Sequence, residues 1–227
     1  MVRALLFGGG GVTHGEDPML EDFLITLLPA SPLVGYIGFA NDDDPVRLER
    51  MIKRFHKLGA AVLPLPQTAS AKDAERWAAQ LNAIYVSGGH TANMICHWRK
   101  TGIDAVLFAA AKRGVLLSGV SAGAVAWFDY AFWDGNGEGF RPLKGLGLLK
   151  GSCCPHFTTE PERAIAYRKY IIQDLLPAGF AIGDGAGLFI DNTKSPKMIL
   201  ARRDTGVWRI ENIGQNLKLT TLTEITL

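Results

Sequence analysis

Short apolar runs alternate with amphipathic stretches over the first half of the chain. Five runs bounded by glycine or proline are typical of buried parallel strands, namely residues 4–7, 34–39, 61–64, 83–86 and 115–117. Between them, residues 45–58, 71–81, 92–101 and 104–113 have helical spacing and helix-forming composition. This alternation predicts an α/β fold, a three-layer sandwich with helices on both faces of a mostly parallel central sheet.

The pattern changes beyond about residue 180. Apolar runs at residues 187–190, 197–201 and 206–210 are separated by the turn signals Asp191-Asn192 and Asp204-Thr205-Gly206. Strands separated by such short polar turns predict C-terminal hairpins at an edge of the sheet. At 227 residues and 48% hydrophobic composition, the chain is long enough to bury a substantial core, and we expect one domain over residues 1–227.

Charge and cysteine content argue against several classes of partner. The 24 basic and 22 acidic residues form no long block of one sign, which is unlike a nucleic-acid-binding surface. Residues 114–128 are too short and too often interrupted by serine and glycine to span a membrane. The three cysteines are an odd number with two adjacent, which fits a reducing cytoplasm, and no signal-peptide core is visible at the N-terminus. We expect a cytoplasmic monomer or small homo-oligomer that acts on a small molecule or peptide.

One serine lies where a nucleophile would be expected. The segment Gly119-Val120-Ser121-Ala122-Gly123 follows an apolar run and leads into the helix-compatible residues 124–128. This is the G-x-S-x-G arrangement of a nucleophile elbow, in which glycines allow a sharp strand-to-helix turn. The N-terminus of the following helix directs free N–H groups toward negative charge that forms beside Ser121. The segment therefore predicts a nucleophile and half of an oxyanion hole.

Other polar segments also follow predicted strands. Because ligands bind beyond the carboxyl ends of parallel strands, Ser121, residues 87–90 and residues 41–44 could line one edge of the sheet. The pair Gly88-Gly89 could contribute a second oxyanion N–H or could simply form a flexible turn. Residues 41–44 fit better as a solvated loop and helix cap before Pro45. The glycine run at residues 8–11 does not match the dinucleotide-binding spacing.

A serine nucleophile requires a base and usually an orienting acid. Among five histidines, His156 follows a predicted strand and the rigid Pro155 turn, a position that suits a catalytic side chain. The other four have no comparable context: His56 and His97 fall in helical stretches, His14 follows the glycine run, and His90 follows Gly89. The candidates for the acid remain open at Asp129, Asp134, Asp184 and Asp191.

Four motifs in this order resemble the peptidase E family (aspartyl dipeptidases, serine peptidase family S51), to which the cyanophycinases are related. Residues 87–91 resemble its Gly-Gly-Asn-Thr loop, residues 119–124 its Gly-x-Ser-Ala-Gly-Ala elbow, residues 155–158 its Pro-His-Phe segment, and residues 182–185 its short acidic loop. The resemblance covers nearly the whole chain. It implies a glutamine amidotransferase-like sandwich and a hydrolase that needs no metal or organic cofactor.

Carried over residue by residue, the resemblance implies Ser121 as nucleophile, His156 as general base and Asp184 as the orienting acid. Gly88, Gly89 and Ala122 become the oxyanion hole. Family members that prefer an N-terminal aspartate use an arginine after the histidine to pair with its carboxylate, and Arg163 is the best match, with His90 and Thr91 also in the substrate site.

Two departures from the family pattern affect these expectations. His90 replaces the usual asparagine, and imidazole does not reproduce both amide hydrogen bonds. Aspartate at position 184 stands where glutamate is frequent, so its shorter side chain requires a closer backbone approach.

The leading interpretation is a serine-type dipeptidase that acts on small peptides such as Asp-X. The alternatives are a cyanophycinase-like hydrolase of β-aspartyl-arginine peptides and a non-catalytic binding domain of the same fold. Glutamine amidotransferases carry cysteine at the elbow, where this chain has Ser121.

Overall fold

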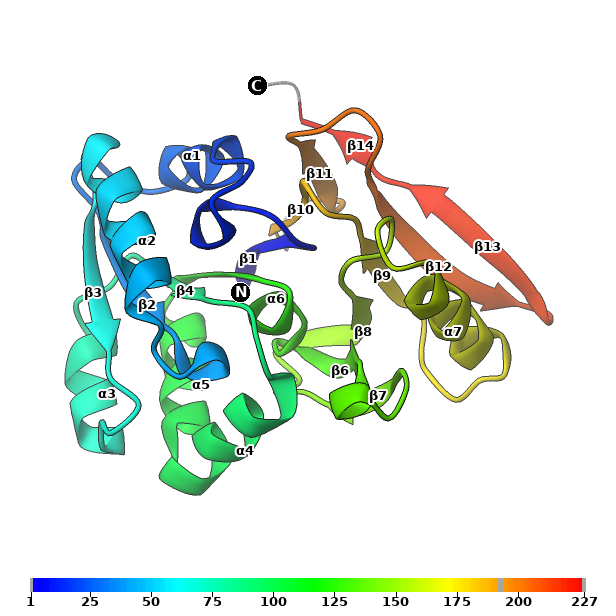
Figure 1. Cartoon of the computed structure of the whole chain (residues 1–227), viewed down its shortest axis with the longest axis horizontal. Coiled ribbons are helices and arrows are strands. Elements are labelled where there is room, and N and C mark those ends of the chain that lie inside the picture. The colour runs from blue at the N-terminus through cyan, green and yellow to red at the C-terminus, as the bar shows by residue number, and fades with distance from the viewer. Residues whose placement is uncertain (1, 192–193, 226–227) are drawn as a thin grey trace.

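The computed structural model describes residues 2–191 and 194–225 and contains two β-sheets (Figure 1). The larger sheet has the order β14-β11-β10-β1-β5-β4-β2-β3. Its parallel part consists of β1 (Arg3–Phe7), β2 (Leu33–Ile37), β3 (Ala61–Leu65), β4 (Ala83–Val86) and β5 (Leu116–Val120). These are the five strands that the apolar runs predict, and the α/β sandwich with a mostly parallel sheet is confirmed.

Helices cover both faces of this sheet because its side chains alternate. Leu5 and Phe7 pack with α1 (Met19–Thr26) and α2 (Pro45–Lys57), whereas Ala4 and Leu6 belong to the core on the opposite face. That second face is covered by α3 (Ala71–Ala78), α4 (Thr91–Thr101) and α5 (Ile103–Lys112). The four predicted helices are confirmed, with ends within three residues of expectation.

A second sheet, which the hydrophobic pattern does not predict, lies beside the first (Figure 1). Its order is β13-β12-β9-β8-β6-β7, with bounds β6 Phe128–Trp133, β7 Arg141–Lys144, β8 Leu149–Cys154, β9 Gly179–Ile182, β12 Val207–Ile213 and β13 Asn216–Thr221. Helix α7 (Pro161–Ile172) packs on one face of this sheet. One hydrophobic cluster joins both sheets, and a single domain over residues 1–227 stays a prediction.

The region after the elbow differs from expectation. The helix α6 spans only Ala122–Val125, and β6 begins at Phe128, so residues 124–128 do not form the helix that their composition suggests. Asp129 lies on β6. Buried Trp127 and Phe128 pack in the core shared by the two sheets, and this tertiary environment outweighs local helix propensity.

The C-terminal strands form antiparallel pairs in two different sheets. Strand β10 (Ala186–Asp191) pairs with β1 and β11 (Lys197–Leu200), and the short β14 (Thr223–Glu224) extends this edge. Strands β12 and β13 form a hairpin in the second sheet. Hence β11 and β12 are not hairpin partners, and the predicted turn at Asp191-Asn192 includes a residue outside the described ranges.

The carboxyl ends of strands from both sheets meet at one place. Segments that follow β1, β2, β4 and β5 lie at the same edge of the larger sheet, and they include the short helices η1 (Val12–His14) and η2 (Phe39–Asn41). The parallel neighbours β8 and β9 end beside them, since Gly9 and Asp184 form a β-bridge. A third short helix, η3 (Gly135–Gly137), follows β6. Over residues 2–191 and 194–225, no helix has the length and apolar character needed to cross a bilayer.

A buried carboxyl group links α1 to the parallel sheet. Glu21 is fully buried, and its Oε1 accepts hydrogen bonds from the Val12 N–H at 3.0 Å and the Tyr85 hydroxyl at 2.9 Å. Its Oε2 has no partner among the described residues. Burial raises the pKa of Glu21 from 4.5 to about 7, more than these hydrogen bonds lower it.

This raised pKa predicts a pH-dependent stability. The native state binds the Glu21 proton more tightly than the unfolded state, so stability should fall as pH rises from about 4.5 to about 7. The free-energy change from this group is on the order of 3 kcal/mol. Urea unfolding should give a lower free energy of unfolding at pH 8 than at pH 5 in the wild type. In Glu21→Gln the difference between the two pH values should be much smaller. Equal pH dependence in both proteins would contradict this assignment.

Candidate active site

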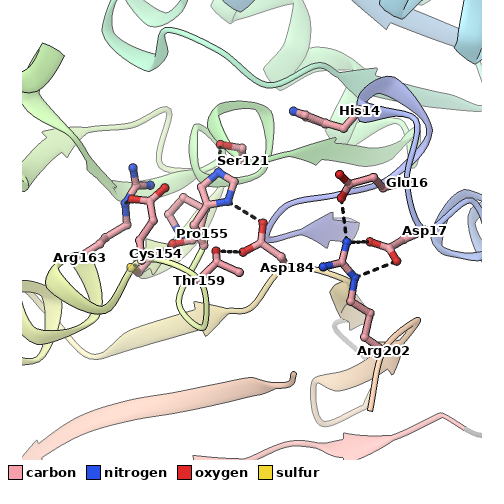
Figure 2. Close-up of polar contacts among 12 residues, drawn as sticks. His14, Glu16, Asp17, Ser121, Cys154, Pro155, Thr159, Arg163, Asp184 and Arg202 are labelled. Carbon is pink, nitrogen blue, oxygen red and sulfur yellow. Dashed lines mark hydrogen bonds and ion pairs between the residues drawn. The ribbon is translucent and has the colours of Figure 1, made fainter. Parts of the chain in front are cut away.

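Three side chains from distant parts of the chain form a hydrogen-bonded series (Figure 2). Ser121 follows β5, His156 follows β8, and Asp184 follows β9. The His156 Nε2 lies 2.8 Å from the Ser121 Oγ, and its Nδ1 lies 2.7 Å from the Asp184 Oδ1. The structure therefore brings together the serine, imidazole and carboxylate to which the family resemblance assigns the catalytic roles.

The elbow depends on close backbone approach between α6 and β4. Ser121 has φ 53° and ψ −115°, an unusual conformation for a residue with a side chain, and its N–H donates to the Phe7 carbonyl at 3.0 Å. A Cβ at Gly123 would lie only 2.1 Å from the Val86 carbonyl oxygen. Glycine at this position therefore allows the sharp turn that exposes the Ser121 hydroxyl.

A second glycine makes room for the acid. A Cβ at Gly9 would lie 1.6 Å from the Asp184 Oδ1 and 2.7 Å from the His156 Nδ1. The glycine run after β1 thus provides the close approach that an aspartate at position 184 requires. Sequence reasoning found the run but assigned it no role, because nothing local connects it to residues 156 and 184.

The surroundings of Asp184 favour its ionised form. Burial acts to raise the pKa of this carboxyl, but the hydrogen bond and charge of His156, with the Thr159 hydroxyl and Arg202, hold it below its usual value. Thr159 donates to the Asp184 Oδ2, a contact that sequence reasoning did not find. An ionised Asp184 accepts the Nδ1–H of His156, which leaves Nε2 free to accept the Ser121 proton.

The other three candidate acids lie elsewhere. Asp129 accepts from the Gly151 N–H at 2.9 Å, and Asp191 ends β10 opposite Arg3. Asp134 accepts from the Asn136 N–H at 3.0 Å and lines the cavity beside Ser121 without a hydrogen bond to His156. Of these four, only Asp184 lies within hydrogen-bond distance of His156.

Backbone donors lie next to the Ser121 hydroxyl. Ala122 and Gly123 are the first residues of α6, so their N–H groups have no partner within that helix. A Cβ at Gly88 would lie 3.3 Å from the Ser121 Cβ, which places this loop against Ser121. Gly89 lines the same cavity as Ser121 and Ala122. These groups can stabilise negative charge beside Ser121.

The cavity around Ser121 is small and strongly polar. Its volume is about 230 Å³, below the range that holds drug-sized ligands, and it suits a compact charged ligand. Both acidic and basic side chains line this cavity: His14, Arg47, Asp134, Glu160 and Arg163. His14 extends its ring toward Ser121 (Figure 2), and burial, then Arg47, lowers its pKa. Sequence reasoning missed His14, Arg47 and Glu160, because each acquires its position only through folding.

Arg163 lines this cavity but already has a partner. Its side chain is 8% exposed, and its Nε lies 2.8 Å from the Glu160 Oε2. Its guanidinium lies 5.0 Å from the centre of the Phe140 ring. Arg163 is therefore not an ordinary surface charge, but its positive charge is already paired with a carboxylate.

The two residues after Gly89 begin helix α4. His90 is the N-cap, and its Nδ1 accepts the Asn93 N–H at 3.1 Å, which is the capping role that asparagine commonly performs. Its Nε2 lies 3.2 Å from the Asn136 Oδ1. Thr91 is buried and lines the cavity, whereas His90 is turned toward η3.

Comparison with known proteins agrees with this arrangement. The sequence model of peptidase family S51 matches residues 4–198. The uncharacterized peptidase YgaJ of Bacillus subtilis (strain 168) is 30% identical over 213 residues, which cover 92% of each chain.

Two solved structures share the fold. A peptidase from an acI-B1 actinobacterium has a TM-score of 0.76 at 17% identity and covers 100% of this chain and 96% of its own. A candidate peptidase E protein from Listeria monocytogenes EGD-e has a TM-score of 0.63 at 20% identity and covers 98% and 100%.

Proposed function

The chain belongs to peptidase family S51, and we propose that it is a serine-type dipeptidase that releases the N-terminal residue of small peptides through an acyl-enzyme on Ser121. The observation that carries this proposal is the series Ser121–His156–Asp184, with contacts of 2.8 and 2.7 Å. A serine hydroxyl is a weak nucleophile unless a base within hydrogen-bond distance removes its proton, and this geometry meets that requirement.

In the proposed mechanism, the Ser121 Oγ attacks the scissile carbonyl carbon while its proton passes to the His156 Nε2. The carbonyl oxygen becomes an oxyanion that accepts hydrogen bonds from the Gly89 and Ala122 N–H groups. His156 then protonates the leaving amine, and the C–N bond breaks. Water, deprotonated by His156, attacks the acyl-enzyme; the bond between the acyl carbon and the Ser121 Oγ breaks, His156 returns the proton to the Oγ, and the free amino acid leaves. Asp184 stays ionised and stabilises the imidazolium in each step.

The small cavity supports a preference for short peptides. A dipeptide carries a positive amine and a negative carboxylate close together, and the cavity presents both acidic and basic groups. Asp-X peptides are the acidic candidates, and Arg163 is the residue that would pair with the aspartate carboxylate. Because Glu160 already neutralises Arg163, such a substrate has to replace an existing ion pair. We therefore propose that the preference for aspartate is modest.

A dipeptide panel tests this proposal. Wild type is expected to hydrolyse Asp-Leu and Ala-Leu with kcat/KM values within about tenfold of each other, because rearranging one paired charge is worth on the order of 1 kcal/mol. Arg163→Ala should reduce the Asp-Leu to Ala-Leu ratio, and Arg168→Ala, on the same helix, is the matched control. Equal ratios in wild type and Arg163→Ala would remove Arg163 from the specificity site.

A fluorophosphonate probe separates the enzyme from its non-catalytic alternative. Labelling confined to Ser121 requires an activated hydroxyl, so a folded protein that resists the probe and cleaves no peptide would refute the proposal. Release of dipeptides from a β-aspartyl-arginine polymer, without cleavage of dipeptides, would instead identify the cyanophycinase-like activity.

A further inference from the structure

We propose that Asn41 is a positioning residue for the oxyanion hole, because it holds the peptide between Gly88 and Gly89 in the orientation that directs the Gly89 N–H toward the Ser121 cavity. This inference rests on the proposed function, in which the Gly89 N–H stabilises the oxyanion. Residues 41–44 were expected to be a solvated loop and helix cap. That expectation is correct for Asp44, whose carboxylate caps α2 by accepting from the Val46 N–H, but it misses Asn41.

The Asn41 side chain is held at both ends of its amide. Its Oδ1 accepts the Asp44 N–H at 3.1 Å, at the start of α2. Its Nδ2 donates to the Ser87 hydroxyl at 2.8 Å and to the Gly88 carbonyl oxygen at 2.9 Å. Because the oxygen end is bound to an N–H donor, the nitrogen end has to face residues 87 and 88. The side chain therefore connects η2 to the loop that follows β4.

A second donor reaches the same carbonyl. Arg47, on α2, donates from a guanidinium NH₂ group to the Gly88 carbonyl oxygen at 3.0 Å. Two donors, one of them charged, thus fix the direction of this C=O bond and polarise its peptide group. Polarisation of the carbonyl strengthens the N–H on the other side of the same peptide as a donor.

Because the peptide bond is planar, fixing the Gly88 C=O also fixes the direction of the Gly89 N–H. In a trans peptide the C=O and the following N–H point in opposite directions. With the Gly88 oxygen directed toward Asn41 and Arg47, the Gly89 N–H points away from them. Gly89 lines the cavity together with Ser121, Ala122 and Arg47, and the proposed role of Asn41 requires the Gly89 N–H to face the Ser121 side of it.

The rest of the loop is clamped by the same segment. The His90 N–H donates to the Ala40 carbonyl oxygen, and the Ser87 N–H donates to the Ile37 carbonyl at 2.9 Å. A Cβ at Gly89 would lie 2.0 Å from the Ala40 oxygen, so the two segments are in direct backbone contact. Within this contact, the Asn41 side chain adds the hydrogen bond to the Gly88 carbonyl oxygen that orients the Gly88–Gly89 peptide.

The test combines kinetics with a transition-state analogue. A dipeptide trifluoromethyl ketone is attacked at its carbonyl carbon by the Ser121 Oγ, the serine proton passes to His156, and the carbonyl oxygen becomes a bound oxyanion. In Asn41→Asp, which keeps the acceptor toward Asp44 but loses the donor, we expect kcat to fall and the inhibition constant to rise by about 10- to 100-fold. KM should stay within about threefold, because substrate binding does not need the oxyanion donor.

The matched control is Asp42→Asn. Asp42 is the adjacent exposed residue with φ 56°, which asparagine tolerates, and it is not a partner of residues 87–90. It should leave kcat, KM and inhibitor affinity unchanged. Asn41→Ala is the second variant, and thermal unfolding shows whether each protein is folded.

The possible outcomes separate the two proposals. An active wild type whose folded Asn41 variants keep kcat and inhibitor affinity within twofold would overturn the positioning role and leave the proposed function intact. Equal changes in KM and the inhibition constant would also overturn it, since they indicate a general loss of binding. A wild type that neither cleaves dipeptides nor reacts with the ketone would overturn both.

Discussion

Replacing Ser121 with alanine is expected to lower kcat for dipeptide hydrolysis by ~10⁴- to 10⁶-fold, the largest effect of any single substitution in this chain. The variant keeps the backbone donors of Gly89 and Ala122 but has no atom that can form the acyl-enzyme. Because the Ser121 hydroxyl bonds only to His156 among the described residues, the unfolding temperature should change little. Steady-state assays with an active-site-titrated wild type as reference measure the loss.

Ser118→Ala is the matched control for this substitution. Ser118 lies on β5, the strand that precedes Ser121, is fully buried, and donates to the Leu5 carbonyl oxygen at 2.7 Å. Its loss should reduce stability by about 1 kcal/mol while leaving kcat nearly unchanged. If Ser121→Ala retained turnover comparable to wild type, the nucleophile would have to be another residue.

Replacing Asp184 with asparagine is expected to lower kcat by ~10⁴-fold, the second largest effect. The amide of asparagine can donate to the His156 Nδ1, which then carries no proton, so the Nε2 holds the proton and cannot accept one from Ser121. The change is nearly isosteric, and the contact with the Thr159 hydroxyl can persist through the amide oxygen. The measurement is kcat at neutral pH, with fluorophosphonate labelling as a second readout of Ser121 reactivity.

The neighbouring variant Asp134→Asn provides the comparison. Asp134 lines the same cavity but does not contact His156, so its loss should affect KM more than kcat. A larger fall in kcat for Asp134→Asn than for Asp184→Asn would reverse the assignment of the orienting acid.

The parallel sheet could be predicted because four of its five parallel strands, all but the edge strand β3, are buried on both faces. A short, continuous apolar run such as residues 83–86 or 115–117 is then most simply interpreted as a buried strand. The elbow could be predicted for a similar reason, since G-x-S-x-G between a strand and a helix is a local requirement of backbone geometry. The second sheet was not predicted as a sheet. A strand before His156 and one at residues 206–210 were expected, but β6 depends on contacts with β8 and with the shared core. Residues 124–128, read by themselves, favour a helix.

The identity of the carboxylate that contacts His156 was likewise beyond what local sequence pattern could determine. Local pattern left Asp129, Asp134, Asp184 and Asp191 as open candidates, and only resemblance to a family separated them. The structure supplies the physical reason: β8 and β9 are parallel neighbours, so His156 and Asp184 follow adjacent strand ends, and Gly9 leaves the space between them.

What the sequence determined by itself about this protein is a set of local structures: the five parallel strands, the four helices between them, the sharp turn at Ser121 and the rigid turn before His156. Each depends on residues within one turn or strand, so the chain encodes it directly. Only the tertiary structure decided that His156 meets Asp184, that Glu160 neutralises Arg163, and that Asn41 and Arg47 hold the Gly88 carbonyl. Most of these contacts join residues tens of positions apart, and even the pairing of Arg163 with Glu160, close in sequence, depends on the folded pocket that both line and that buries Arg163. The tertiary packing of strands and helices therefore selects them, and no local pattern contains that information.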